Sequence, residues 1–193
     1  MVASQTSVKN METKKDIRKR VLEARKAMTK KEWEEKSDSI CEKVTSHPFF
    51  LESEEIYSYI DYRNEVGTRA IIEKAWQMGK RVAVPKTDGD KMSFYYIDSF
   101  DDVLPGNWNI LEPKTDKPAD GKNVCVIMPG SVFDRKRNRI GYGKGYYDKY
   151  LSEHSGYVTI ALAFELQMLD EIPSEEFDIK PQCIMTEEKI YAE

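Results

Sequence analysis

Strand-like and helix-like segments alternate along most of this chain, and this alternation is the feature that most restricts its fold. Apolar runs at 55–60, 81–84 and 124–128 have the length and composition of buried strands. Residues 68–78, between the first two runs, have helical periodicity and end at Gly79. A strand, a helix and a strand in this order predict a βαβ unit with parallel strands.

Further elements are expected on both sides of this unit. One predicted helix covers 13–28, and a second begins at Thr29 and stops before Pro48. Pro85 is expected to end the strand at 81–84. The remaining predicted elements are strands at 92–97, 157–164 and 183–185 and a helix at 145–154. The fold class predicted from this order is α/β: a single domain over residues 1–193 whose mainly parallel sheet is covered on both faces.

The amino-terminal region is basic, whereas the rest of the chain is acidic. Residues 1–31 contain ten lysines and arginines against three acidic residues, although the whole chain has a net charge of −4. Thr13 and Asp16 have capping-box spacing, and Ile17 and Val21 begin an apolar stripe. We therefore predict that 1–31 is a basic amino-terminal helix, solvated on one face and docked on an acidic body.

The composition argues against several kinds of site and partner. Three cysteines without a Cys-x-x-Cys pair predict neither a disulfide framework nor a structural zinc site. Only two histidines are present, and neither lies in a recognisable catalytic motif. The longest apolar run is much shorter than the roughly 20 residues of a membrane-spanning helix. We expect a cytoplasmic monomer without nucleic-acid or membrane partners.

The glycine-rich segment after the central apolar run carries the clearest chemical signal. It precedes a predicted helix, in the position where open α/β sheets bind ligands. Gly141, Gly143 and Gly145 allow backbone amides to approach an anion, while Arg139 and Lys144 add positive charge. The spacing differs from a Walker A loop and from a dinucleotide fingerprint. We interpret the segment as a phosphate-binding loop, and a tight glycine turn with solvated charges is the alternative.

The residues around this loop resemble a known family. Phe133-Asp134 followed by Arg139-Ile-Gly-Tyr-Gly-Lys-Gly-Tyr-Tyr-Asp148 is similar to the signature of 5-formyltetrahydrofolate cyclo-ligases, also called 5,10-methenyltetrahydrofolate synthetases. Three more elements resemble the family in the same order: Lys14-Lys15-x-x-Arg18, the segment 57–68, and Ile110-Leu-Glu-Pro113. The resemblance implies a three-layer α/β/α sandwich, ATP and Mg²⁺ as cofactors, and 5-formyltetrahydrofolate, with or without a polyglutamate tail, as substrate.

The resemblance also implies roles for individual residues. Lys144 and Arg139 are implied as catalytic residues and Asp148 as the metal ligand. The implied ATP-binding residues are Lys14, Lys15, Asp16, Ile17, Arg18, Arg139, Ile140, Gly141, Tyr142, Gly143, Lys144, Gly145, Tyr146 and Tyr147. The implied folate-binding residues are Arg18, Ile60, Glu65, Tyr142, Gly143, Lys144, Gly145 and Tyr146.

The chain departs from the family pattern at three positions. Arg137 and Asn109 stand where the family usually has glycine, and Gln182 stands where it often has an aspartate that completes the metal site. The loss of a metal carboxylate favours one alternative, a non-catalytic nucleotide- or phosphosugar-binding protein on the same fold.

Overall fold

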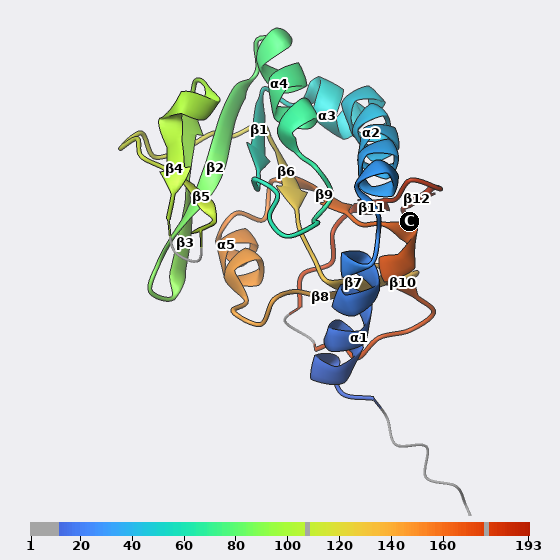
Figure 1. The fold of residues 1–193 in the computed structure, drawn as a ribbon. Helices are drawn as coiled ribbons and strands as arrows, with labels where there is room; N and C mark the ends of the chain where they lie inside the picture. The colour runs from blue at the N-terminus through green and yellow to red at the C-terminus, as the bar shows by residue number, and fades with distance from the viewer. Residues whose placement is uncertain (1–11, 107–108, 176–177) are drawn as a thin grey trace, which may run out of the picture.

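A seven-stranded sheet forms the centre of the molecule in the computed structural model, which describes residues 12–106, 109–175 and 178–193 (Figure 1). The strands lie in the order β12-β11-β9-β6-β1-β2-β3. Their bounds are β1 (Glu55–Ser58), β2 (Arg81–Asp88), β3 (Lys91–Ile97), β6 (Val124–Met128), β9 (Val158–Leu162), β11 (Cys183–Met185) and β12 (Ile190–Tyr191).

The pairing in this sheet is mainly parallel, as the sequence predicts. Strands β2, β1, β6, β9 and β11 are parallel to their neighbours in that series, and only the edge strands β3 and β12 pair antiparallel. The predicted βαβ unit is confirmed as β1, α4 (Arg69–Gln77) and β2. The other helices are α1 (Lys14–Lys26), α2 (Lys30–Ser46), α3 (Pro48–Glu52) and α5 (Tyr146–Glu153).

Helices cover both faces of the sheet, which confirms the predicted three layers. In β6, Cys125 and Ile127 pack with the apolar residues of α2, α3 and α4, whereas Val124, Val126 and Met128 pack with α5. This alternation follows from the two-residue period of a strand, and all five residues are buried because both faces are covered. Figure 1 shows α2, α3 and α4 on one side of the sheet and α5 on the other.

The expectation that Pro85 ends its strand is wrong, because β2 continues to Asp88. Pro85 lacks a backbone N–H, so it fits only where a strand has no donor to satisfy. The pairing of β2 with β1 stops at Ala83, whereas its antiparallel pairing with β3 continues past Pro85. The proline therefore lies where one side of β2 no longer has a partner strand.

The basic segment contributes α1, which packs away from the main sheet. Residues 1–11 lie outside the described part of the chain; α1 ends at Lys26, and α2 begins after a capping box at Thr29. Ile17 and Val21 pack on a three-stranded sheet of β7 (Val132–Asp134), β8 (Arg139–Ile140) and β10 (Met168–Leu169), beside which Figure 1 shows α1. A separate two-stranded sheet consists of β4 (Val103–Pro105) and β5 (Leu111–Pro113). None of the helices in the described ranges is long and apolar enough to cross a membrane.

A buried carboxylate holds the turn that joins β7 to β8. Asp134 is fully buried and accepts hydrogen bonds from the backbone N–H groups of Lys136, Asn138 and Ile172, at 2.9, 2.9 and 3.2 Å. The side-chain amide of Asn138 donates a fourth bond at 2.8 Å. This single side chain therefore satisfies donors in the β7–β8 turn and in the segment after β10.

We predict that Asp134→Ala destabilises the fold by about 3 kcal/mol or more, because it leaves several buried donors without an acceptor. Urea unfolding of the purified protein measures this change. Asp170→Ala, which removes a 93% exposed carboxylate paired with Arg135, is the control and should leave the unfolding midpoint nearly unchanged. Equal midpoints for the two variants would contradict this account of the turn.

Candidate active site

Two loops that follow neighbouring parallel strands lie at one end of the sheet. Strands β1 and β6 are paired in parallel, so the segments that leave their carboxyl ends start side by side. The segment after β1 contains Glu65, and the segment after β6 leads through β7 and β8 into the glycine loop, residues 141–145. The end of α1 reaches the same place, because Arg25 bonds to a residue of each loop. This is the predicted position for a ligand site.

The glycine loop has the backbone conformation expected of an anion-binding turn. Gly143 has φ of 103° and Gly145 has φ of 64°, a region that side chains with a Cβ rarely adopt. Gly145 is also the N-cap of α5, so the first free N–H groups of that helix face the same end of the loop. A carbon built on Gly143 would lie 3.7 Å from an Nη atom of Arg18, so the predicted Arg18 and the loop are indeed together.

Two arginines at this site, one buried and one half-buried, have a donor without a partner. Nη2 of Arg139 donates to both carboxylate oxygens of Asp148, at 2.9 and 3.0 Å. Within the described residues, however, Nε of Arg139 and Nε of Arg18 are buried and have no hydrogen-bond acceptor. Buried polar groups are nearly always satisfied, so unpaired cationic donors beside a glycine loop fit an anionic ligand such as a phosphate chain.

The second loop places the buried Glu65 directly after a strained, exposed turn. Arg63 and Asn64 have φ of 48° and 58°, which is unusual for two consecutive residues other than glycine. The Glu65 carboxylate accepts a bond from the backbone N–H of Tyr62 at 2.9 Å, and its backbone carbonyl accepts one from Nε1 of Trp33 at 2.7 Å. Burial raises the pKa of the Glu65 carboxyl. Strain at such a turn is typical of functional positions.

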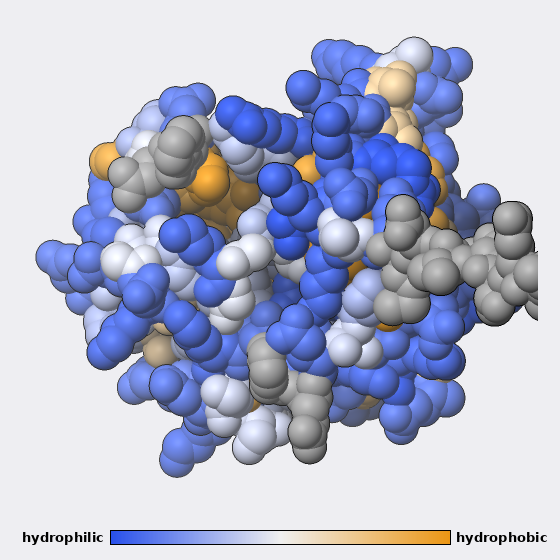
Figure 2. Space-filling view, turned by 90° about the horizontal axis from the view of Figure 1, so that it is seen from below, coloured by the Kyte–Doolittle hydropathy of each residue, from blue (hydrophilic) through white to orange (hydrophobic). Residues whose placement is uncertain are grey.

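Ile60, the other predicted folate position, lines a surface cavity of about 570 Å³. Trp33, Gly67 and Leu111 are among the residues that line the same cavity. A volume of this size is large enough for an organic ligand. The face of the molecule in Figure 2 is mostly hydrophilic and has one hollow in which apolar residues come to the surface.

The predicted nucleotide residues of α1 point in different directions. Lys14 forms ion pairs with Glu175 and Asp178, at 2.9 and 3.0 Å, and Asp16 bonds with the N-cap residue Thr13. Ile17 is buried in the core, so it could meet a ligand only through its backbone. Lys15 is exposed. Of the predicted α1 residues, Arg18 is therefore the one that the structure places against the glycine loop.

The predicted residues of the loop and of the start of α5 also differ in their surroundings. Ile140 is buried in β8 and Tyr147 in α5, whereas Lys144 is exposed. The hydroxyl of Tyr146 donates to the carbonyl of Gly89 in the β2–β3 turn, at 2.9 Å. The loop and the tip of this hairpin are thus joined by a side chain.

The predicted metal ligand is a single carboxylate, Asp148, in the first turn of α5. The described ranges contain no group of three or more histidine, cysteine, aspartate or glutamate side chains placed to hold a metal. Asp148 is bonded to Arg139 and accepts a further bond from the backbone N–H of Ile179 at 3.1 Å. Magnesium commonly takes one or two carboxylates and leaves its other positions to phosphates and water. Gln182, at the other family metal position, uses its side-chain oxygen to accept a hydrogen bond from the backbone N–H of Thr159.

The two residues at family glycine positions adopt glycine-like conformations. Asn109 has φ of 63° and Arg137 has φ of 64°. Arg137 is held by a bond from its side chain to the backbone carbonyl of Gln182, at 2.9 Å. Both residues therefore adopt the left-handed backbone conformation that glycine favours, despite their side chains.

Two residues important to this geometry were not predicted from the sequence. Arg25 lies seven residues after Arg18, on the same face of α1, and this spacing could have indicated it. Trp33 could not be distinguished in the sequence from any apolar residue of α2. Its role depends on a bond to the distant Glu65.

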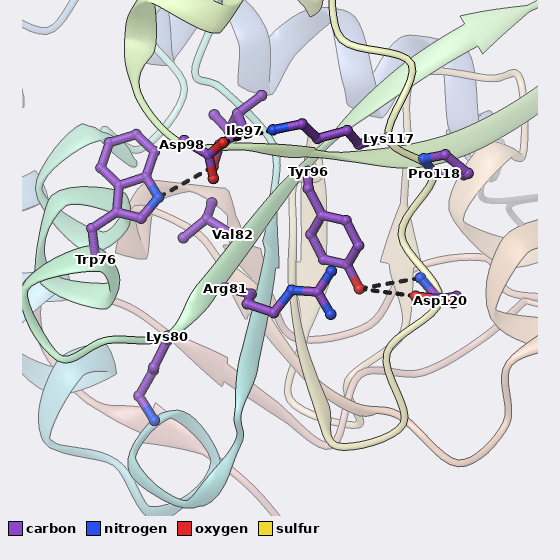
Figure 3. Close-up of a pocket in the computed structure, with 10 residues that line it drawn as sticks. All are labelled: Trp76, Lys80, Arg81, Val82, Tyr96, Ile97, Asp98, Lys117, Pro118 and Asp120. Carbon is purple, nitrogen blue, oxygen red and sulfur yellow. Dashed lines mark hydrogen bonds and ion pairs between the residues drawn. The ribbon is translucent and has the colours of Figure 1, made fainter.

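A second cavity, of about 400 Å³, lies at the opposite ends of the strands (Figure 3). Arg81, the first residue of β2, lines it and is paired with Glu55, the first residue of β1, at 3.1 Å. Lys117 is paired with Asp98 at 2.7 Å. Because ligands of open parallel sheets bind at the carboxyl ends, and because these charges neutralise one another, this cavity is not the candidate active site.

We predict that Gly143→Ala destabilises the protein by about 1–3 kcal/mol, because alanine at φ of 103° is strained. Thermal and urea unfolding measure the effect. Gly156→Ala is the matched control, since Gly156 has no positive φ and a Cβ there would meet no atom within 4 Å. An unchanged unfolding midpoint for Gly143→Ala would show that the loop does not require this conformation.

Comparisons with known proteins point to one family. Residues 10–187 match the 5-formyltetrahydrofolate cyclo-ligase family. The 5-formyltetrahydrofolate cyclo-ligase of Mus musculus is 29% identical over 190 residues, which cover 91% of this chain and 94% of the mouse protein. The solved structure of 5,10-methenyltetrahydrofolate synthetase from Aquifex aeolicus superposes with a TM-score of 0.82 at 26% identity, and covers 93% of this chain and 92% of that one.

A second solved structure supports the fold. It is the 5,10-methenyltetrahydrofolate synthetase from Mycoplasma pneumoniae, with a TM-score of 0.73, 22% identity, and coverage of 90% of this chain and 98% of that chain. The match of the family extends over both loops of the site and over α1. This chain therefore belongs to the 5-formyltetrahydrofolate cyclo-ligase family.

Proposed function

We propose that this protein converts 5-formyltetrahydrofolate to 5,10-methenyltetrahydrofolate in a reaction that consumes ATP and releases ADP and phosphate. One observation carries the proposal: the buried, unpaired Nε donors of Arg18 and Arg139 lie at a glycine loop next to the turn that holds Glu65. The first feature suits phosphates, and the second suits the N–H groups of a pterin.

The substrate chemistry explains why ATP is required. The formyl group on N5 is an amide-like carbonyl, and its oxygen is a poor leaving group. Transfer of the γ-phosphoryl group to this oxygen gives an iminium phosphate and releases ADP. N10 then bonds to the formyl carbon and loses its proton to water, and the carbon–oxygen bond breaks so that phosphate leaves with the bonding electron pair. Phosphoryl transfer depends mainly on positioning and charge stabilisation, so the protein needs cations and amides rather than a nucleophile.

The residues of the site divide this work. Arg18, Arg139 and Lys144 stabilise the charge on the transferred group, and the amides of the glycine loop hold the phosphate chain. Glu65 accepts hydrogen bonds from the pterin, and the cavity at Ile60 takes part of the folate. Magnesium bound with ATP would lower the negative charge of the phosphates, and Asp148 would be its protein ligand. A cytoplasmic location, a monomeric state and acceptance of a polyglutamate tail stay predictions from the sequence.

We predict that the purified protein forms the methenyl product only when ATP and Mg²⁺ are both present, because the carbonyl must be phosphorylated before the ring closes. The absorbance of the methenyl product measures this directly. Turnover without ATP would contradict the phosphorylation step. Binding of ATP without any folate turnover would favour the alternative, a non-catalytic nucleotide- or phosphosugar-binding protein.

We predict that Lys144→Ala lowers kcat by about 100-fold, the usual effect of removing one donor that stabilises developing charge. Its thermal unfolding should match the wild type, because Lys144 is exposed. The control is Lys149→Ala, which removes an exposed lysine from α5 outside the glycine loop. Similar kcat values for both variants would mean that Lys144 does not contact the transferred phosphoryl group.

A further inference from the structure

Arg25 is a buried arginine near the end of α1 whose role the reaction chemistry does not explain. It is only 4% exposed, which is rare for a charged side chain. Its Nη1 donates to the hydroxyl of Tyr142 at 3.1 Å, and its Nη2 donates to the backbone carbonyl of Arg63 at 3.2 Å. In the part of the chain that the structure describes, its guanidinium forms no ion pair. A buried charge held only by neutral acceptors is costly, so a structural role alone is a poor explanation.

The two acceptors of Arg25 belong to the two halves of the proposed site. Tyr142 is part of the glycine loop, and Arg63 is the first left-handed residue of the turn that presents Glu65. One guanidinium therefore joins three segments: the helix that carries Arg18, the glycine loop, and the folate turn. The planar fork of an arginine can make both bonds at once in fixed directions, which a lysine cannot do.

Tyr142 extends this connection to the Glu65 carboxyl. Its ring is 46% exposed, although the hydroxyl is bonded to Arg25. Burial raises the pKa of the Glu65 carboxyl, whereas the Tyr142 hydroxyl and the charge of Arg25 both lower it. A movement of the glycine loop must therefore change the surroundings of Glu65.

We propose that Arg25 is a positioning residue that couples the nucleotide half of the site to the folate half through the hydroxyl of Tyr142. This inference rests on the proposed function, because it assumes that phosphates bind the glycine loop and that folate binds at Glu65. When a nucleotide orders the loop, Tyr142 and Arg25 hold the folate turn and the Glu65 carboxylate in the geometry that accepts the pterin. Nucleotide and folate then strengthen the binding of each other, as linkage requires.

Calorimetric titration of the full chain with 5-formyltetrahydrofolate, with and without Mg²⁺ and a non-hydrolysable ATP analogue, tests this coupling. We expect the wild type to bind folate at least about fivefold more tightly when the analogue is present. Tyr142→Phe removes only the hydroxyl, and Arg25→Met removes only the guanidinium. In both variants the ratio of folate affinity with the analogue to folate affinity without it should be close to one. Arg20→Met is the matched control, because Arg20 is an exposed arginine of the same helix that pairs with Glu12; it should keep the wild-type ratio.

The pH dependence of kcat/KM for folate provides a readout that a purely structural role would not change. Removing the positive charge of Arg25 raises the pKa of Glu65 further, so in Arg25→Met the loss of kcat/KM on acidification should begin at a higher pH. Arg25→Lys keeps the positive charge but loses the planar guanidinium with its two fixed donors. It should therefore lose kcat/KM at the same acidic pH as the wild type, but its folate affinity should no longer depend on the ATP analogue. The charged and titratable groups that face the Glu65 carboxyl are Arg25, Asp61, Tyr59, Tyr142 and Tyr147.

The outcomes separate this inference from the proposed function. A wild-type ratio that persists in Tyr142→Phe and in Arg25→Met would overturn the role of Arg25, and so would equal folate affinity of the wild type with and without the analogue. If the wild type binds no 5-formyltetrahydrofolate under either condition, the proposed function itself fails. Tyr142→Phe alters a half-exposed ring, so it keeps the test decisive if Arg25→Met does not fold.

Discussion

The parallel pairing of β1 with β6 is the interaction on which the site depends. Because the two strands run side by side in the same direction, their carboxyl ends lie together, and so do the loops that follow them. The pairing is protected from water on both faces, by the helices α2, α3 and α4 on one side and by α5 on the other. A glycine loop late in the chain and a glutamate turn early in the chain thus share one end of a rigid sheet, which is the arrangement that favours precise catalytic geometry.

Three arginines surround this site: Arg25 and Arg139 are buried, and Arg18 is half-buried. Within the described residues, Nε of Arg18 and Nε of Arg139 have no acceptor, and the Nη atoms of Arg25 donate only to neutral oxygens. Asp148 neutralises part of the charge of Arg139, whereas Arg18 has the glycine loop as its neighbour. Such an arrangement costs folding free energy without a ligand, and an anion with several oxygens would recover that cost.

The turns around the site show how the chain keeps difficult backbone conformations without glycine. Arg63 and Arg137 both have positive φ, and each is held by hydrogen bonds to distant segments. In the first case the carbonyl of Arg63 receives Arg25, and in the second the side chain of Arg137 reaches the carbonyls before β11. The conformation of each turn is therefore tied to contacts that form only when the whole fold is assembled. The strained backbone positions, Arg63 and Arg137, thus lie in the segments that lead into the site.

Local patterns in the sequence predict the layers of this fold, because burial on one or both faces of a strand leaves its own spacing of apolar residues. The apolar run at Val124–Met128 predicts a strand buried on both faces, which the structure confirms. The glycines with Arg139 and Lys144 predict an anion site, and this stays a prediction. Local patterns do not reveal that β2 passes through Pro85, that Lys14 pairs with Glu175 and Asp178, or that Arg25 joins Tyr142 to the turn of Glu65. Those contacts span up to 164 residues, and no local periodicity or spacing encodes which distant partner a charged side chain will meet when the sheet brings its loops together.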